Sequence, residues 1–476
     1  MEIEVGRGSG PGADEVPRPS GLRARWVAAL RGALAEGALA RQVWPLAWPA
    51  ITHMLLLTLV FVVGRAMVGR HSTSALAAMQ ICGSLTWSVI SIFTATSSGT
   101  LAVVARCVGA GDRAGAAAAA RASLVFAAVL GALVAGPLLI ADGALLRLLF
   151  PRAEAEVIAQ ADSYLRIVLP ALPLAFVEAV AAASLQGAGD TRTPLLAAAA
   201  GNVANVTLSA LLIFGHLGMP ALGLRGAAVG VAATMSIEGL LLVAALARRS
   251  SPLPLFGDAV RGAALARVLR VAVPAFVERV IYQAGYLGYI AIIGLLGAAA
   301  MAANQALISI EAICFLSADG FGIAAGALVA QKLGARRPDE AAQAGRTAAL
   351  MAMLLLAACG LVFVAAPRLL LLTFSSDPAL LSEGERSLYV AAVAQPFMAF
   401  ATVIGMGLRG AGATRAVLVV TLLCSFGVRL GATWLFAITL GYDLVGVWMG
   451  STADWICRTA LFGAIWARGR WREIAV

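Results

Sequence analysis

Long apolar segments constrain this chain more than any other feature of its sequence. About 20 mostly apolar residues form a helix that crosses the hydrocarbon core of a bilayer, where only helices and closed barrels satisfy the backbone hydrogen bonds. The segments here are rich in Ala, Leu and Val and lack the alternation of strands, so they predict helices. We expect twelve transmembrane helices, at 43–68, 76–106, 115–141, 161–185, 195–214, 224–247, 270–296, 300–332, 340–366, 386–408, 414–438 and 443–467.

The composition is that of a membrane protein. Of the 476 residues, 61% are hydrophobic and 13% are charged, whereas soluble domains are about 45–50% apolar and about 25% charged. A net charge of +10 would suggest nucleic-acid binding in a soluble protein, but most of the Lys and Arg lie in the tails and after every second helix. Positive charge marks cytoplasmic loops. We therefore expect a multi-pass protein of the cytoplasmic membrane, with both termini inside the cell and no nucleic-acid partner.

A repeated string indicates that the chain is a duplication. Gly-Ala-Gly-Asp-Thr-Arg at 187–192 recurs as Gly-Ala-Gly-Ala-Thr-Arg at 410–415, 223 positions later, and a shift of 225 places Pro49 on Pro274. Each half then holds six helices, so both halves enter the membrane from the same side. Transporters built from such parallel repeats bind their substrate between the halves. The string itself predicts tight turns between cytoplasmic helix ends, since no phosphate-loop Lys-Ser/Thr follows it.

The duplication predicts an all-α integral membrane protein with two pseudo-symmetric six-helix lobes. An N-terminal tail precedes the N-lobe (helices 1–6), a cytoplasmic linker joins it to the C-lobe (helices 7–12), and a short tail follows. These five parts are expected at 1–42, 43–247, 248–269, 270–467 and 468–476. The first 20 residues are polar and rich in Gly and Pro, which predicts disorder.

Several separate stretches resemble one family. LQGAGDTRTP and LRGAGATR are similar to the ends of the fourth and tenth helices of the multidrug and toxic compound extrusion (MATE) family. FGIAAGALVAQKLGA at 321–335, NVANVTLSALLIFG at 202–215 and GRW at 469–471 also resemble it. The resemblance covers residues 42–472 and implies twelve helices around a central cleft. It further implies export of amphipathic, often cationic, drug-like compounds in exchange for Na⁺ or H⁺.

The chain departs from the family pattern in its N-lobe. Many relatives carry an Asp in helix 1 where this chain has Gly64, followed by Arg65, and an Asp in helix 5 where it has Ser209. The neighbouring Asn205 is retained and is a candidate cleft residue. Ionisable residues inside a membrane are costly and are functional candidates by default. Glu238, near the end of helix 6, is expected to reach the membrane interface.

The remaining candidates for ion coupling lie mostly in the C-lobe. Glu278 in helix 7 and Asp319 in helix 8 have similar estimated depths, so a facing pair could share a proton or bind Na⁺. Alternatively, Glu278 pairs with Arg279 and Asp319 caps a helix break. Glu311 in helix 8 could couple ions as well.

Two further pairs of charges are predicted in the C-lobe. Glu311 and Arg429 have comparable depths and could form a structural ion pair, or one that a drug or a proton releases. Asp454 and Arg458 lie four residues apart on helix 12, which favours a local salt bridge.

His53 falls on Glu278 under the shift of 225, so both lobes carry a titratable group at the same pseudo-symmetric place. Histidine titrates near pH 6.5 and could relay a proton; the alternative is a buried, hydrogen-bonded imidazole.

Aromatic, Met and amide side chains complete the predicted cleft. Aromatic rings bind lipophilic cations, and amides repeated in both lobes suggest hydrogen bonds between helices; packing is the alternative role for each. The candidates are Tyr282, Tyr286, Tyr289, Trp87, Met54, Gln80 and Gln305.

Three functions stay open at this level. The first is an ion-coupled multidrug exporter, and the second is a flippase of related fold for lipid-linked precursors, for which Arg65 and Arg429 are the hints of an anion site. The third is a membrane enzyme, but the three His are widely spaced and show no metal-binding motif. We expect no enzyme activity, no cofactor besides the transported ion, no metal site and a monomer.

If His53 relays protons, His53→Ala changes the pH dependence of efflux, because an imidazole is removed that titrates within the working range. Transport by the variant and by the parent chain in proteoliposomes at a series of pH values tests this. Superimposable pH profiles would rule out the relay.

Overall fold

The computed structural model is almost entirely helical. It describes residues 22–475 apart from 142, 152, 249–250, 252, 254–261 and 375–376. The expected tail at 1–20 and the middle of the expected inter-lobe linker lie outside the described residues. All twelve expected spans are helical, which confirms the fold class.

Helices α1 to α9 form the N-lobe. Their bounds are α1 Leu22–His71, α2 Thr73–Thr94, α3 Ser97–Gly109, α4 Arg113–Ile140, α5 Ala144–Leu149, α6 Ala155–Val168, α7 Leu172–Gly187, α8 Arg192–Phe214 and α9 Leu224–Ala247, with η1 Leu169–Ala171 and η2 His216–Gly218.

Helices α10 to α17 form the C-lobe. Their bounds are α10 Gly262–Leu295, α11 Ala298–Gly334, α12 Pro338–Ala365, α13 Pro367–Leu372, α14 Pro378–Gly410, α15 Thr414–Leu422, α16 Gly431–Thr433 and α17 Asp443–Arg468, with η3 Leu423–Leu430, η4 Trp434–Thr439 and η5 Arg470–Glu473.

Local chemistry explains where the spans break. The second span divides into α2 and α3 where the hydroxyls of Thr94, Thr96 and Ser98 donate to backbone carbonyls at 2.6–2.8 Å, a competition that interrupts helices. The fourth divides between α6 and α7 at a short 3-10 turn that contains Pro170, which has no N–H to donate. The eleventh contains two π-helical stretches, one of which carries Arg429.

The helices meet the requirements of a multi-pass membrane protein. Ten described helices are long and apolar enough to cross a bilayer. The other two expected spans, α10 and α17, carry charged pairs in their middle, Glu278 with Arg279 and Asp454 with Arg458. Large apolar side chains such as Leu133 and Leu361 point outward from the lobes, as lipid-facing residues do. Inside the lobes, many of the buried residues are Ala, which allows close helix packing.

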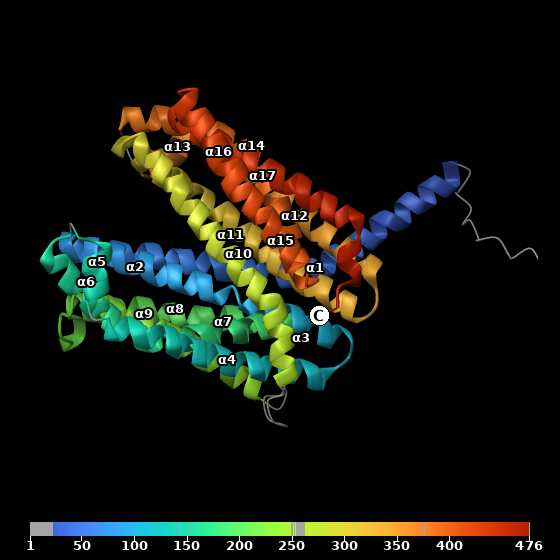
Figure 1. Cartoon of the computed structure of the whole chain (residues 1–476), viewed down its shortest axis with the longest axis horizontal. Coiled ribbons are helices and arrows are strands. Elements are labelled where there is room, and N and C mark those ends of the chain that lie inside the picture. Colours follow the sequence, from blue (N-terminus) through green and yellow to red (C-terminus); the bar gives the residue numbers. More distant parts are fainter. Residues whose placement is uncertain are drawn as a thin grey trace, which may run out of the picture.

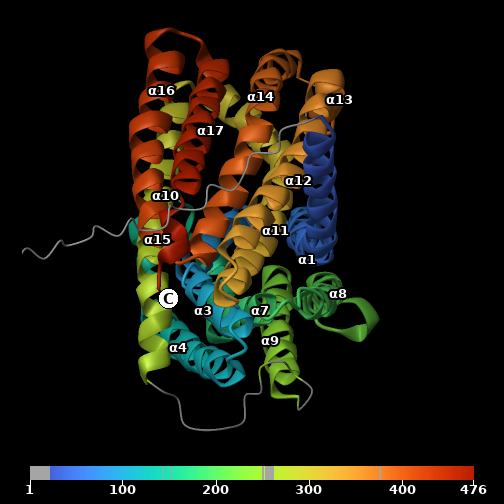
Figure 2. The same ribbon diagram turned by 90° about the vertical axis from the view of Figure 1, so that its right-hand side faces the viewer.

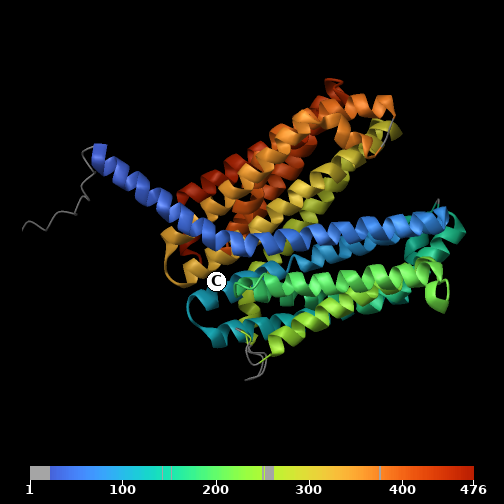
Figure 3. The same cartoon turned by 180° about the vertical axis from the view of Figure 1, so that it is seen from behind.

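The two lobes meet at one end and diverge at the other (Figures 1 and 3). We call the end where they meet, which also holds the C-terminus, the closed end. Two helices cross between the lobes there. The first, α1, packs against both α8 and α11, and the second, α10, packs against α15 and also against α3 and α4 (Figure 2).

Paired glycines allow the lobes to touch at the closed end. A Cβ on Gly109, at the end of α3, would overlap the carbonyl oxygen of Gln331 in α11, and a Cβ on Gly334 would overlap the carbonyl oxygen of Arg106. The shift of 225 relates Arg106 to Gln331 and Gly109 to Gly334, so this contact is itself pseudo-symmetric. Gln331 adds an amide hydrogen bond of 2.8 Å to the carbonyl of Gly187 in the N-lobe.

Gly109→Ala with Gly334→Ala is expected to open the closed end, because two methyl groups must displace backbone from backbone at the contact. The inter-lobe distance between spin labels on the closed-end loops, measured by double electron–electron resonance, should lengthen. Gly136→Ala in α4 is the matched control, since its Cβ would meet nothing within 4 Å. Unchanged distances in the double variant would contradict this account of closure.

Candidate functional site

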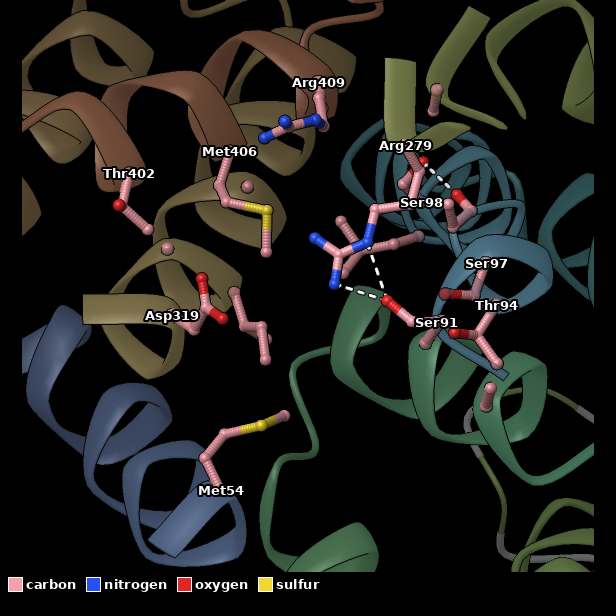
Figure 4. Close-up of a pocket in the computed structure, with 18 of the residues that line it drawn as sticks. Met54, Ser91, Thr94, Ser97, Ser98, Arg279, Asp319, Thr402, Met406 and Arg409 are labelled. Atoms are coloured by element: carbon pink, nitrogen blue, oxygen red, sulfur yellow. Dashed lines mark hydrogen bonds between the residues drawn. The ribbon is translucent and has the colours of Figure 1, made fainter. Parts of the chain in front are cut away.

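A cavity of about 460 Å³ lies between the lobes. Its N-lobe wall comes from α1, α2, α3, α7 and α9, and its C-lobe wall from α10, α11, α14, α15 and α17. Figure 4 shows side chains from both walls pointing toward the space, among them Met54 and Ser91 of the N-lobe and Asp319 and Met406 of the C-lobe. Nearly all of its charged side chains lie on helices whose other residues are mostly apolar.

Glu278 is held by the guanidinium of a residue just beyond the expected tenth span, which was placed at 386–408. Arg409, in the last turn of α14, donates from Nε (3.0 Å) and Nη2 (2.7 Å) to the two carboxylate oxygens of Glu278. The hydroxyl of Thr421 donates to Oε1 at 3.0 Å. Neither expected partner, Arg279 or Asp319, makes this contact. The shift of 223 relates Arg409 to Gln186, which also lines the cavity. This correspondence was the sequence signal that could have identified Arg409 as a cavity residue.

Arg279 points away from Glu278 and toward the other lobe. Its Nε and Nη2 donate to the hydroxyl of Ser91 in α2 at 2.8 and 2.5 Å, and its guanidinium lies 5.4 Å from the centre of the Tyr282 ring. Figure 4 shows this hydrogen bond crossing the cavity. Arg279 thus ties α10 to the N-lobe next to the closed end.

Asp319 lines the cavity from the middle of α11. It lies within electrostatic range of Arg279 and Arg409. The expected sharing of a proton or ion between Glu278 and Asp319 is not seen, because Glu278 binds Arg409 instead. No hydrogen bond or ion pair joins Asp319 to another side chain among the described residues, and an ion-coupling role for either acid stays a prediction. The expected cap at a helix break is wrong, since α11 continues through Gly320.

A second cluster of charges lies deeper in the C-lobe. The fully buried carboxylate of Asp454 lies 2.8 Å from Nε of Arg458 and 2.9 Å from Nε of Arg429. The local pair of Asp454 and Arg458 is thus present as predicted. The Glu311–Arg429 pair is not, because Arg429 turns to Asp454, while Glu311 accepts a hydrogen bond of 3.3 Å from the amide of Gln395.

The aromatic and amide candidates divide into two groups. Tyr282, Trp87 and Met54 line the cavity, as does His53, whose Nδ1 is buried with no hydrogen-bond partner among the described residues. The other candidates lie elsewhere. The rings of Tyr286 and Tyr289 stack with their centres 6.3 Å apart and pack against the C-lobe core, and Gln80 and Gln305 are on exposed helix faces. The amide of Asn205 donates to the Thr234 hydroxyl at 2.9 Å and accepts a hydrogen bond from Ser209.

Two acidic residues of the N-lobe wall escaped the sequence analysis. Glu178 in α7 was not considered, and Glu238 in α9 was expected at the membrane interface. Both line the cavity, and Glu238 is only 5% exposed. Their signal was simply a carboxylate within an apolar helix.

The described residues hold no cluster of three or more His, Cys, Asp or Glu that could bind a metal ion. Cys82, Cys107, Cys314 and Cys424 are buried free thiols, and buried free cysteines commonly pack as small hydrophobic residues. What the cavity offers is a set of fixed charges, two flexible Met and several rings in a space shared by two lobes. Such an arrangement offers both polar and apolar surface to a ligand.

Known proteins share both the sequence and the fold. The MatE family profile matches residues 49–211 and 274–435, one stretch in each lobe. A probable multidrug resistance protein NorM of Thermotoga maritima is 28% identical over 440 residues, which cover 92% of this chain and 94% of that protein. The multidrug resistance protein PmpM of Pseudomonas aeruginosa is 27% identical, with 86% and 87% covered.

A solved structure gives the same result for the fold. The Vibrio cholerae MATE transporter VcmN in its bent form superposes with a TM-score of 0.84 at 20% identity, covering 92% of this chain and 98% of that one.

Arg409→Gln should lower the free energy of unfolding by about 3 kcal/mol, because it leaves the Glu278 carboxylate buried without its cation. Glu278→Gln combined with Arg409→Gln should recover most of that loss. Thermal unfolding of the purified protein in detergent measures both effects. The control is Arg337→Gln, which breaks an exposed pair with Glu340 and should cost less than about 1 kcal/mol. Additive losses in the double variant would disprove the coupling.

Proposed function

Because the chain belongs to the multidrug and toxic compound extrusion (MATE) family, we propose that it is a secondary active exporter. It exports amphipathic cationic compounds by antiport with H⁺ or Na⁺. The observation that carries the proposal is the cavity between the lobes, which combines buried carboxylates with rings and Met side chains. The carboxylates attract a cation, and the rings hold its apolar part.

Size and shape support a drug-sized ligand. A cavity of about 460 Å³ lies within the roughly 300–1,000 Å³ of small-molecule sites. Trp87 is 57% exposed and stands on the N-lobe wall, opposite Tyr282 and Trp455 of the C-lobe wall. A flat lipophilic cation would fit between rings contributed by both lobes.

Alternating access follows from the way the lobes meet. They touch at the closed end through Gly109 and Gly334 and diverge at the other end. The distribution of Lys and Arg supports a cytoplasmic closed end, and with that orientation this conformation would be open to the outside. Rocking of the lobes would break the Arg279–Ser91 tie and expose the cavity to the cytoplasm. The cycle needs no resident cofactor, only the transported ion.

The flippase alternative is less well supported. An anionic lipid headgroup requires cations that are free to bind it. Of the three Arg that line the cavity, Arg409 and Arg458 are paired with the carboxylates of Glu278 and Asp454. This leaves Arg279, which is hydrogen-bonded to the neutral Ser91, as a single cation for an anionic headgroup. Arg65, one of the sequence hints, lies over the Phe61 ring at 4.3 Å and is not among the cavity residues. The other hint, Arg429, is engaged by Asp454.

Proteoliposomes with the purified chain should accumulate ethidium against its gradient when a pH or Na⁺ gradient is imposed alone. The two gradients are applied separately, so the same assay identifies the ion. Liposomes without protein give the background. If neither gradient drives uptake at any pH tested, the chain is not an ion-coupled exporter of lipophilic cations.

Trp87→Ala and Tyr282→Ala should each raise the Kd for tetraphenylphosphonium by about ten-fold, because each removes a ring that faces a bound cation. Fluorescence titration of the detergent-purified protein measures the Kd. The matched control is Trp434→Ala, a ring 49% exposed and outside the cavity. Equal Kd values for all three variants would place the cation elsewhere.

A further inference from the structure

Two glutamates of the N-lobe converge on the cavity from adjacent helices. Glu178 stands on α7 and Glu238 on α9, and both line the cavity. The helices are in close contact beside them: a Cβ on Gly239, the residue after Glu238, would lie 2.8 Å from the carbonyl oxygen of Leu174, one turn before Glu178. The two carboxylates lie within electrostatic range of each other. Two ionised carboxylates that lie within this range repel each other.

Glu238 is buried and incompletely bonded. Glu238 is only 5% exposed, and its Oε1 has no hydrogen-bond partner among the described residues. It packs so closely on α8 that a Cβ at Gly201 would lie 2.6 Å from Oε1. A buried, unpaired carboxylate oxygen is costly unless a cation or a proton compensates it.

At the corresponding place in the C-lobe, the charge of an acid is compensated by a base. A shift of 220 relates Glu238 to Arg458 and Thr234 to Asp454. In the C-lobe the two residues form an ion pair, at 2.8 Å. In the N-lobe the residue one turn before the acid is the neutral Thr234, which donates to the carbonyls of Gly201 and Gly230 instead. The N-lobe acid is thus left without the partner that its counterpart has.

No basic group of the cavity wall serves the pair. The titratable groups that share the cavity with it are His53 of α1, Glu278, Arg279 and Tyr282 of α10, Asp319 of α11, Arg409 of α14 and Arg458 of α17. All three Arg belong to the C-lobe and are held by Glu278, Ser91 and Asp454. On the N-lobe wall, the described lining residues include no Lys or Arg.

We propose that Glu178 and Glu238 form a proton-binding site, and that a permanent cation binding at the N-lobe wall displaces the proton they share. This assignment rests on the proposed function and deepens it, by naming the coupling ion and its site. One proton removes the repulsion between the two carboxylates. A cationic substrate removes it equally well, so the two ligands exclude each other, as antiport requires.

A proton suits the place better than a metal cation. Na⁺ needs several oxygen ligands around it, whereas a proton needs only the two carboxylates. The lining residues next to Glu178 on α7 are Ala179, Ala182 and Ala183, whose side chains carry no oxygen. The proposal therefore moves the coupling role from Glu278, whose carboxylate is bound by Arg409, to two N-lobe acids for which no basic partner is found among the described lining residues.

Proton release on binding tests the site directly. Tetraphenylphosphonium is added to the detergent-purified full chain in weak buffer, and the pH change is recorded with the binding isotherm. The parent chain should release up to about one proton per cation bound, depending on pH. Glu178→Gln and Glu238→Gln should each reduce the release at least five-fold while still binding the cation. Glu383→Gln, an exposed acid at the open end, is the control and should release as the parent does.

A variant that shifts the Glu238 carboxylate without removing it tests the site while every acid is retained. Gly201→Ala keeps every acid but places a methyl group against the Glu238 carboxylate. It should shift the pH at which release is half-maximal. In the parent chain, dicyclohexylcarbodiimide, which modifies protonated carboxyls in apolar surroundings, should label Glu178 or Glu238, and tetraphenylphosphonium should block the labelling. This measurement needs no variant, so a misfolded mutant cannot obscure the answer.

The outcomes separate the two proposals. Full proton release from the parent, Glu178→Gln and Glu238→Gln alike would support ion-coupled export but overturn this site, as would labelling at neither glutamate. Displacement of the cation by Na⁺ with no proton release would overturn the choice of the proton. If the parent binds neither tetraphenylphosphonium nor ethidium, the proposed function fails, and this inference fails with it.

Discussion

The rest of this structure depends on how charge is compensated inside helices that cross a bilayer. In the C-lobe, two of the acids in or beside the cavity are bound by guanidinium groups: Glu278 binds Arg409, and Asp454 lies between two Arg. In the N-lobe two acids face the same space, and the described residues of their wall include no Lys or Arg. Because two carboxylates in a low-dielectric place repel each other strongly, this difference is the basis for proposing that the N-lobe wall binds the cation.

The duplication supplies the frame within which that difference matters. The glycine contacts at the closed end obey the repeat closely, since Gly109 and Gly334 meet backbone at related positions. The charges do not obey it, because Glu238 corresponds to Arg458 and His53 to Glu278. Two lobes with the same shape can rock against each other about a common contact. Two lobes with different charges can bind different ligands while they do so.

Much of the fold was predictable, and the reason is physical. Lipid imposes helices of a minimum length, so twelve apolar segments became twelve helical spans, and the repeat gave their grouping. The candidate site was predictable only in part. Tyr282, Trp87, Met54, His53, Glu278 and Asp319 line the cavity as expected, but Tyr286, Tyr289, Gln80, Gln305 and Asn205 do not. Rotation about a helix axis decides which face meets the cavity, and hydropathy within a uniformly apolar helix says little about rotation.

The pairing of the buried charges was harder to predict than the residues that line the cavity. Depth along a helix suggested Glu311 for Arg429 and Asp319 for Glu278, but the pairs that form, Arg429 with Asp454 and Glu278 with Arg409, join helices whose contact the sequence does not reveal. The sequence by itself determined a helical membrane protein, its duplication, its family and the inventory of buried charges. Only the tertiary structure decided which of those charges neutralise one another and which remain free for a ligand, because that depends on distances of a few ångströms between helices far apart in the chain.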